Sequence, residues 1–339
     1  MTIPDEDLLF ATAFYHAAGK SPNAWTFSHE SKLHMYYRCM IVCYASLRRL
    51  YPKSQLMFFS NSELPEPFAA QLKSLEVITE KCPDHYVLDS AFNNGFPGCL
   101  YTLDVIDYLG KQANKNYKNL ILIDNDCIVR SRLDAMIEDQ SINQTLYAYA
   151  PGYPVNMVAN GQSRASLTLA LTYFQGKMLS APIELYGGEF YAIPSDALST
   201  MANDIQSFWT WMKTDGINIF GNQLTEEHVM SAALSMQSER LREVTTEIKR
   251  IWTTEHFSTV EGNESEISIW HLPSEKKKGL AKMYHYWLKH NGFNNLDDKD
   301  FNQIVNSLVG LQINQPKNKL IQLCYRLYNA TKYIITGRM

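Results

Sequence analysis

The sequence lacks long hydrophobic runs, Cys-x-x-Cys pairs and internal repeats. No apolar stretch approaches the roughly 18 residues that a helix needs to cross a bilayer, which excludes a spanning segment. Residues 1–8 are acidic and lack the charged-then-apolar order of a signal peptide, so we expect no secretory leader. The six cysteines contain no Cys-x-x-Cys pair, and several lie in apolar runs. This usage favours reduced, buried thiols in a cytosolic protein.

Acidic residues are missing from the C-terminal end of the chain. Residues 301–339 carry five basic residues and no acidic one, whereas the rest carries 26 basic and 35 acidic residues. A general nucleic-acid binder would place its basic patch on the main domain, so the acidic body argues against that class. The basic tail leaves contact with an anionic surface open.

The chain has 339 residues, of which 45% are hydrophobic and 19% are charged. This composition excludes a disordered chain, a collagen-like repeat and a small disulfide scaffold. The length suits one large domain with an appendage, or two modest domains.

Short apolar runs alternate with helical periodicities over the first 123 residues. The apolar runs predict buried strands at residues 8–14, 55–59, 76–79 and 120–123. Apolar residues spaced three and four apart predict helices over residues 33–47, 64–75 and 98–112. The alternation predicts an α/β fold with a parallel sheet covered on both faces. Ligands bind such sheets beyond the carboxyl ends of the strands.

The second half is less regular. A long connection, residues 151–182, contains one predicted helical piece at 164–173. Thr225 is a good helix N-cap, with His228 three residues later in place of the usual glutamate. A further strand is expected at residues 267–270, and it ends at His271.

Asp124, Asn125 and Asp126 follow directly on the strand expected at residues 120–123. Two carboxylates at this spacing, at the end of a buried parallel strand, project into the ligand crevice. Two oxygen ligands from one turn suit a hard divalent cation that keeps positions open for a diphosphate. An ordinary acidic turn at a strand end is the alternative.

His271 and the lysines at 276–278 follow the late strand. The histidine could complete a metal shell, and lysines in a loop that contains glycine could clamp phosphates. A hydrogen-bonded histidine at the rim of the core and a solvated lysine loop are the alternatives, and in isolation the residues favour them.

Together these features resemble the GT-A nucleotide-sugar glycosyltransferases, above all glycosyltransferase family 8 and its relatives. The first strand, with Ala11, Thr12 and Ala13, is similar to the base-binding strand of that family. Residues 120–129 resemble its strand with the Asp-x-Asp metal motif, where Asp124 and Asn125 would also meet the donor. The resemblance implies a GT-A fold, a Rossmann-like and mostly parallel sheet flanked by helices.

The resemblance also implies roles for later residues. Gly187 and Gly188 lie where such enzymes place a turn of small residues beside the donor sugar. Residues 271–277 match the late His-x-x-Gly-x-x-Lys motif, with Ser274 in place of the glycine. By this match His271 would be the third metal ligand, beside Asp124 and Asp126, and Lys277 would contact the diphosphate.

Three glutamates are the candidate catalytic residues. Glu226 or Glu227 could deprotonate an acceptor hydroxyl, as an inverting enzyme requires, or hold sugar hydroxyls in a retaining one. The alternative is a pair of acids favoured at a helix N-terminus by the macrodipole. Glu189 follows two glycines that allow close backbone approach, so it could touch the donor sugar or the acceptor.

We therefore expect a GT-A domain over residues 1–290 and a helical extension over 291–339. Within the extension, a basic amphipathic helix at 317–336 is expected to contact an anionic membrane from the cytoplasmic side. Packing of that helix on the body is the alternative.

The expected activity is transfer of a hexose or related sugar from a UDP-sugar to a glycan, with Mn²⁺ or Mg²⁺, in cell-surface polysaccharide or lipid-linked glycan synthesis. A haloacid-dehalogenase-type phosphohydrolase and a non-catalytic sugar- or partner-binding module are the alternative functions.

Overall fold

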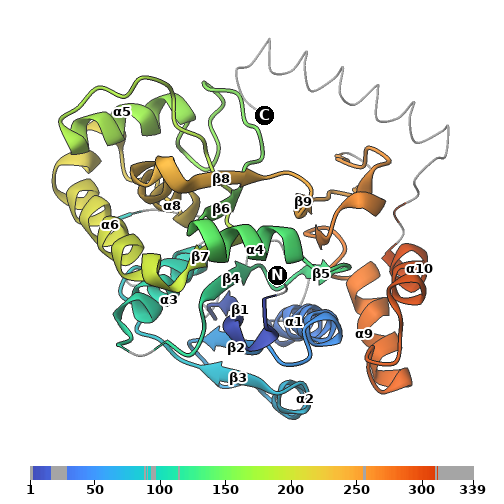
Figure 1. The fold of residues 1–339 in the computed structure, drawn as a ribbon. Helices are drawn as coiled ribbons and strands as arrows, with labels where there is room; N and C mark the ends of the chain where they lie inside the picture. The colour runs from blue at the N-terminus through green and yellow to red at the C-terminus, as the bar shows by residue number, and fades with distance from the viewer. Residues whose placement is uncertain are drawn as a thin grey trace. The chain divides into compact units, whose positions relative to one another are not determined.

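The computed structural model describes residues 3–16, 29–87, 89, 91–92, 97–113, 115–254, 257–309 and 311. The chain divides into two compact units, each built from several stretches of sequence. The first unit comprises Met1–His34, Tyr51–Asn125 and Leu133–Thr245, and the second comprises Met35–Leu50, Asp126–Arg132 and Thr246–Met339. The elements of both units are labelled in Figure 1.

The first unit contains a seven-stranded sheet with the order β3-β2-β1-β4-β7-β6-β8 (Figure 1). Its strands are β1 (Leu8–Phe14), β2 (Gln55–Ser60), β3 (Val77–Glu80), β4 (Asn119–Ile123), β6 (Leu146–Tyr149), β7 (Phe190–Pro194) and β8 (Leu241–Val244). β3, β2, β1 and β4 are parallel, β7 is antiparallel to β4 and β6, and β6 is parallel to β8. The four strands expected in the first half of the chain are confirmed. All five residues of β4 are buried, which explains why their sequence is apolar without alternation.

Helices connect and cover these strands. Those of the first unit are α2 (Phe68–Ser74), α3 (Tyr101–Lys111), α4 (Asp134–Asn143), α5 (Arg164–Gln175), α6 (Leu198–Trp211), α7 (Ile217–Phe220) and α8 (Glu226–Met236), while α1 (His29–Leu50) has residues in both units. A π-helical turn, Met212–Gly216, joins α6 to α7, and short 3₁₀ turns lie at Asp5–Asp7, Pro97–Leu100, Ser195–Ala197, Ser238–Arg240 and Glu264–Glu266.

The sequence predicted α2 to begin four residues too early. It starts at Phe68, because Pro65 and Pro67 disfavour the helical conformation in the residues that precede them.

The contact between α3 and α6 requires a glycine at position 110. A Cβ on Gly110 would lie 2.7 Å from Cβ of Ala202 and 2.8 Å from the carbonyl oxygen of Leu198, so only glycine lets α3 and α6 approach this closely.

The second unit contains a three-stranded sheet, β5-β10-β9, formed by β5 (Cys127–Val129), β9 (Ile248–Arg250) and β10 (Ile269–His271). The strand expected at 267–270 is therefore confirmed with a slightly later start. His271 is the last residue of β10 and pairs with Cys127, the first residue of β5. This register brings His271 close to Asp126, because Asp126 immediately precedes β5. The helices α9 (Gly279–His290) and α10 (Asp298–Val309) complete this unit.

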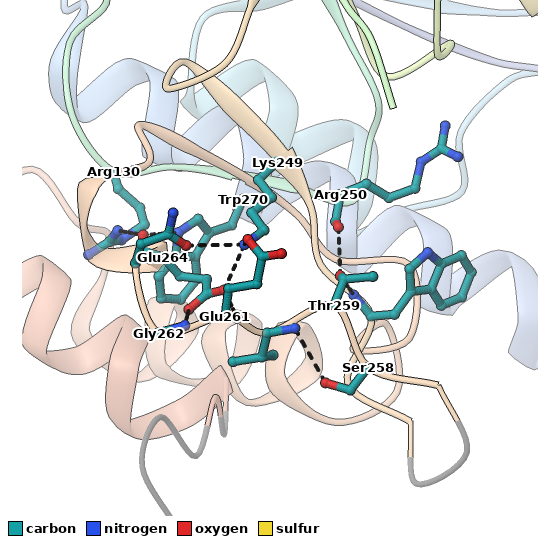
Figure 2. Close-up of polar contacts among 12 residues, drawn as sticks. Arg130, Lys249, Arg250, Ser258, Thr259, Glu261, Gly262, Glu264 and Trp270 are labelled. Carbon is teal, nitrogen blue, oxygen red and sulfur yellow. Dashed lines mark hydrogen bonds and ion pairs between the residues drawn. The ribbon is translucent and has the colours of Figure 1, made fainter. Parts of the chain in front are cut away.

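The loop between β9 and β10 is held by a buried glutamate. Glu264 is fully buried, accepts two backbone N–H groups of the same loop and forms an ion pair with Lys249 at 2.9 Å (Figure 2). The guanidinium of Arg130 lies 4.1 Å from the centre of the Trp270 ring and donates a 2.9 Å hydrogen bond to the Glu264 carbonyl. These contacts fix Trp270, and therefore the neighbouring His271, in place.

The described residues answer some of the remaining expectations and leave others undecided. The amphipathic helix expected at 317–336 and Cys324 lie outside the described residues. The five cysteines in the described part of the chain form no disulfide, as expected. No helix among the described residues is long and apolar enough to cross a membrane. The domain boundary after residue 290 stays a prediction.

Candidate active site

The turn after β4 is held by groups other than its two carboxylates. The backbone N–H of Asp124 donates to the carbonyl of Glu189, which precedes β7. The side chain of Asn125 accepts a 2.7 Å hydrogen bond from the Thr12 hydroxyl and donates a 2.9 Å bond to the Ala13 carbonyl. Asn125 therefore ties the carboxyl end of β4 to that of β1, so that the expected base-binding strand and the Asp-Asn-Asp turn hold a fixed relation.

Asp126 meets two residues from the segment that starts at β10. It is 5% exposed, and its Oδ1 lies 3.3 Å from Nε2 of His271, which is 6% exposed. Its Oδ2 forms an ion pair with the ammonium group of Lys276. Burial alone would raise the pKa of Asp126, but the charges of Lys276 and His271 hold that pKa well below its usual range. Asp126 is therefore a carboxylate, as a metal ligand must be.

The donor set at this turn fits a divalent metal ion. Asp124 is two residues from Asp126 along the chain, and Asp124, Asp126 and His271 each offer one atom that could bind a metal ion. Two carboxylate oxygens and one imidazole nitrogen suit Mn²⁺, and also Mg²⁺, with positions left for other ligands. Asp126 and His271 are therefore in contact, as the sequence led us to expect, and the binding of a metal ion by them and by Asp124 stays a prediction.

Lys276, and not the predicted diphosphate contact Lys277, forms an ion pair with Asp126. The resemblance placed Lys277 in register as the diphosphate contact, whereas Lys276 reaches Asp126 and Lys277 is exposed. The loop turns back twice, through hydrogen bonds from Glu275 N–H to Leu272 and from Lys278 N–H to Glu275. The sequence offers three consecutive lysines and no means to choose among them. The role of Lys277 stays a prediction.

The first turn of α8 confirms the predicted cap. The backbone N–H of Thr225 donates to Nδ1 of His228 over 3.0 Å, and Nε2 of His228 donates to the Ala159 carbonyl over 3.0 Å. Burial lowers the pKa of His228 to about 4, so the ring is neutral at physiological pH. Its role is structural, and it sets the start of α8 and therefore the places of Glu226 and Glu227.

Glu227 is held by two donors. It is 7% exposed and accepts hydrogen bonds from the Asn160 side chain at 3.1 Å and from the backbone N–H of Gly188 at 3.4 Å. Asn160 lies in the long connection between β6 and α5, where no sequence pattern pointed to it. Its contact with Glu227 gives that connection a part in positioning the acids.

Glu226 lies against the glycine turn. A Cβ on Gly188 would stand only 2.6 Å from its Oε1, so the small residue that the sequence provides is required for this approach. Burial, and then the charges of Glu227 and Asp124, raise the pKa of Glu226 to about 8. The thiol of Cys99 hydrogen-bonds to it and acts in the opposite direction. Among the described residues, Oε2 of Glu226 is buried without a hydrogen-bond partner.

The pKa of a buried tyrosine indicates that several acidic residues of the first unit lie near it. Tyr191, in β7, is fully buried, and burial followed by the charges of Glu226, Glu227, Glu189 and Asp124 raises its pKa well above the usual value. Its hydroxyl has no hydrogen-bond partner within the described part of the chain. Glu189 itself is fully buried. The three glutamates and Asp124 therefore surround one region of the first unit.

Comparison with known proteins gives matches among solved structures alone. No model of a protein family matches the chain, and no curated protein matches it. An active-site mutant of LgtC is 10% identical over 88% of this chain and 96% of that chain, with a TM-score of 0.50. The chain has the GT-A fold. This similarity shows the fold alone, and membership of family 8 stays a prediction.

Two other solved structures are less similar in shape. The bifunctional glycosyltransferase WbbM is 10% identical with a TM-score of 0.49, over 94% of this chain and 51% of its own. Mouse xyloside xylosyltransferase 1 is 12% identical with a TM-score of 0.46, over 79% of this chain and 98% of its own.

Proposed function

We propose that this protein is a metal-dependent glycosyltransferase that moves a hexose or a related sugar from a UDP-sugar to a glycan acceptor. The observation that carries the proposal is that Asp124 and Asp126 directly follow β4 and that Asp126 contacts His271, in a chain with the GT-A fold. In an open α/β sheet this end of the strands is the place where ligands bind.

Asp124, Asp126 and His271 would hold Mn²⁺ or Mg²⁺. The bound ion would neutralise the negative charge of the nucleoside diphosphate as it leaves the sugar. The contact with His271 fixes the position of Asp126. Because the pKa of Asp126 is low, its carboxylate is already ionised and loses no proton when it binds the ion.

The donor nucleotide would lie along the carboxyl end of β1. Ala11, Thr12 and Ala13 would face its base and ribose, and the bonds of Asn125 to Thr12 and Ala13 keep this segment beside the Asp-Asn-Asp turn. Asn125 would act mainly by this positioning. Lys277, which is exposed, would reach the diphosphate from its loop.

The three glutamates would handle the sugars in different protonation states. With a pKa raised to about 8, Glu226 carries a proton at neutral pH and would donate a hydrogen bond to a sugar hydroxyl rather than accept a proton from it. Glu227, fixed by Asn160 and Gly188, or Glu189 would act as the base of an inverting reaction. In a retaining reaction the same residues would hold the sugar. Gly187 and Gly188 leave room for the donor sugar beside these acids.

The GT-A fold favours glycosyl transfer over the phosphohydrolase alternative. A non-catalytic binding module of the same fold is separated from the enzyme by experiment. We further propose an acceptor in cell-surface polysaccharide or lipid-linked glycan synthesis, with residues 317–336 lying on the inner, cytoplasmic face of an anionic membrane.

Donor hydrolysis tests the proposed activity. The purified protein is incubated with a panel of nucleotide sugars, with Mn²⁺ or with a chelator, and release of the nucleoside diphosphate is measured. We expect metal-dependent release of UDP from at least one UDP-sugar, loss of that release in Asp126→Asn, and retention of it in Asp7→Asn. Asp7 is a matched control because its carboxylate pairs with Lys118 at 2.8 Å on the surface. Absence of release from every donor would refute the enzymatic proposal.

A further inference from the structure

A lysine ammonium lies on a carboxylate oxygen of the candidate metal site. Lys276 forms an ion pair with Oδ2 of Asp126, while Oδ1 of the same carboxylate faces Nε2 of His271 at 3.3 Å. Asp126 therefore has a cationic or hydrogen-bond-donating partner on each of its two oxygens.

The position of Lys276 is built into the second unit. Its side chain is 12% exposed, its ammonium lies 5.6 Å from the centre of the Tyr36 ring, and it also reaches the Pro273 carbonyl at 3.4 Å. The thiol of Cys39 lies 4.0 Å from the backbone carbonyl of the same lysine. These contacts come from α1 and from the loop that follows β10, so the lysine is placed by two separate segments.

An ammonium group and a divalent cation cannot share this carboxylate without strong repulsion. Both are cations, and inside a poorly solvated site their repulsion is much larger than in water. An unpaired buried carboxylate is also unfavourable, so in the absence of an ion Asp126 needs a positive partner. Lys276 provides that partner.

We infer that Lys276 is a displaceable counter-ion of the metal site: it neutralises Asp126 before the divalent cation binds, and it leaves Asp126 when the cation arrives. This inference rests on the proposed metal site and adds a competitor to it. The free energy of breaking the ion pair is subtracted from that of metal binding, so Lys276 lowers the affinity for the ion. The released ammonium is then available to an anionic ligand of the bound ion.

Direct Mn²⁺ binding tests the competition without any enzymatic readout. Calorimetric titration of wild type, Lys276→Met, Lys276→Arg and Lys278→Met gives the Kd of each. We expect Lys276→Met to bind Mn²⁺ with a Kd at least roughly tenfold lower than wild type, because the competing charge is gone. Lys276→Arg keeps a cation, and Lys278→Met alters an exposed lysine two residues away, so both should stay close to wild type.

Thermal unfolding provides a second readout on the same proteins. Without metal, Lys276→Met should melt at a lower temperature than wild type, because Asp126 is left buried without its ammonium partner. Mn²⁺ should raise its Tm by more than it raises that of wild type, in keeping with the tighter binding.

Amine labelling tests the displacement in the unaltered protein. Reductive methylation followed by mass spectrometry should modify Lys276 slowly without Mn²⁺ and several-fold faster at saturating Mn²⁺, while Lys278 changes little. Equal Mn²⁺ affinity of wild type and Lys276→Met, or labelling of Lys276 that Mn²⁺ does not alter, would overturn the competition and leave the glycosyltransferase proposal in place. Absence of Mn²⁺ binding by every protein in the series would overturn the metal site itself, and the competition with it.

Discussion

Replacement of Gly188 by alanine tests whether the approach of the glycine turn to Glu226 matters for function. Gly188 does not occupy the left-handed region of the backbone map, so alanine introduces no backbone strain there. Its Cβ would, however, stand 2.6 Å from Oε1 of Glu226, where ordinary contacts begin at 3.4 Å. The Glu226 carboxyl group must therefore move by roughly 0.8 Å.

The effect on activity should be larger than the effect on stability. Oε1 is at the end of a flexible side chain, so the clash is relieved by a change in its torsion angles and the Tm should fall by only a few degrees. Displacement of a group at the reacting centre by about 1 Å can reduce the rate by roughly 10²-fold. We expect a loss of this order in the metal-dependent release of UDP from the donor.

A double variant separates displacement of Glu226 from other effects. If Gly188→Ala acts by moving Glu226, then Gly188→Ala/Glu226→Ala should be no less active than Glu226→Ala alone, because residues in contact are not additive. A Gly188→Ala protein with a rate within a factor of two of wild type would show that this displacement of Glu226 does not matter for the reaction. Additive losses in the double variant would show that Gly188→Ala does not act through Glu226.

The structure and the sequence also predict the direction of three further effects, on pH dependence, on stability and on membrane binding. The pKa of Glu226 is raised to about 8, so between pH 4.5 and 8 the folded chain keeps a proton that the unfolded chain has lost. The free energy of unfolding of wild type should therefore fall as pH rises through this range, by about 1.4 kcal/mol per pH unit. Urea unfolding of Glu226→Gln should lack this contribution, and the same dependence of the free energy of unfolding on pH in both proteins would contradict it. Asp126→Asn leaves the Lys276 ammonium buried without its carboxylate, so denaturant unfolding in chelator should show a loss of about 3–5 kcal/mol, against about 0–1 kcal/mol for the surface pair broken in Asp7→Asn. A chain that ends near residue 315 should lose flotation with anionic liposomes that the full chain shows, and flotation that survives the truncation would remove the membrane role of residues 317–336.

The strands and the place of the Asp-Asn-Asp turn could be predicted from the sequence because both depend on local patterns. A strand buried on both faces, such as β4, must be apolar throughout, and the residues after it must lie at the ligand edge of the sheet. Thr225 and His228 were similarly readable, since a helix cap involves residues only three positions apart. His271 could be placed on a strand end by pattern, but its partner Asp126 required the resemblance.

The remaining parts of the site depend on contacts between distant segments. The contact of Lys276 with Asp126 depends on the hydrogen-bonded turns after β10, and three consecutive lysines give no periodicity that distinguishes one of them. The support of Glu227 by Asn160 joins residues 67 positions apart, and nothing around Asn160 distinguishes it from other polar loop residues. The apolar pattern placed the start of α2 at residue 64, whereas Pro65 and Pro67 delay it to Phe68.

The proposed activity requires that the protein bind a nucleoside diphosphate through a divalent ion held by the Asp-Asn-Asp turn. UDP binding is measured by calorimetry with saturating Mn²⁺ and again with chelator, for wild type and for Asp126→Asn. We expect wild type to bind UDP with Mn²⁺ at least roughly tenfold more tightly than with chelator, and Asp126→Asn to lose this dependence. UDP affinity that is the same with Mn²⁺ and with chelator, or absent in both, would contradict a metal-dependent nucleotide site.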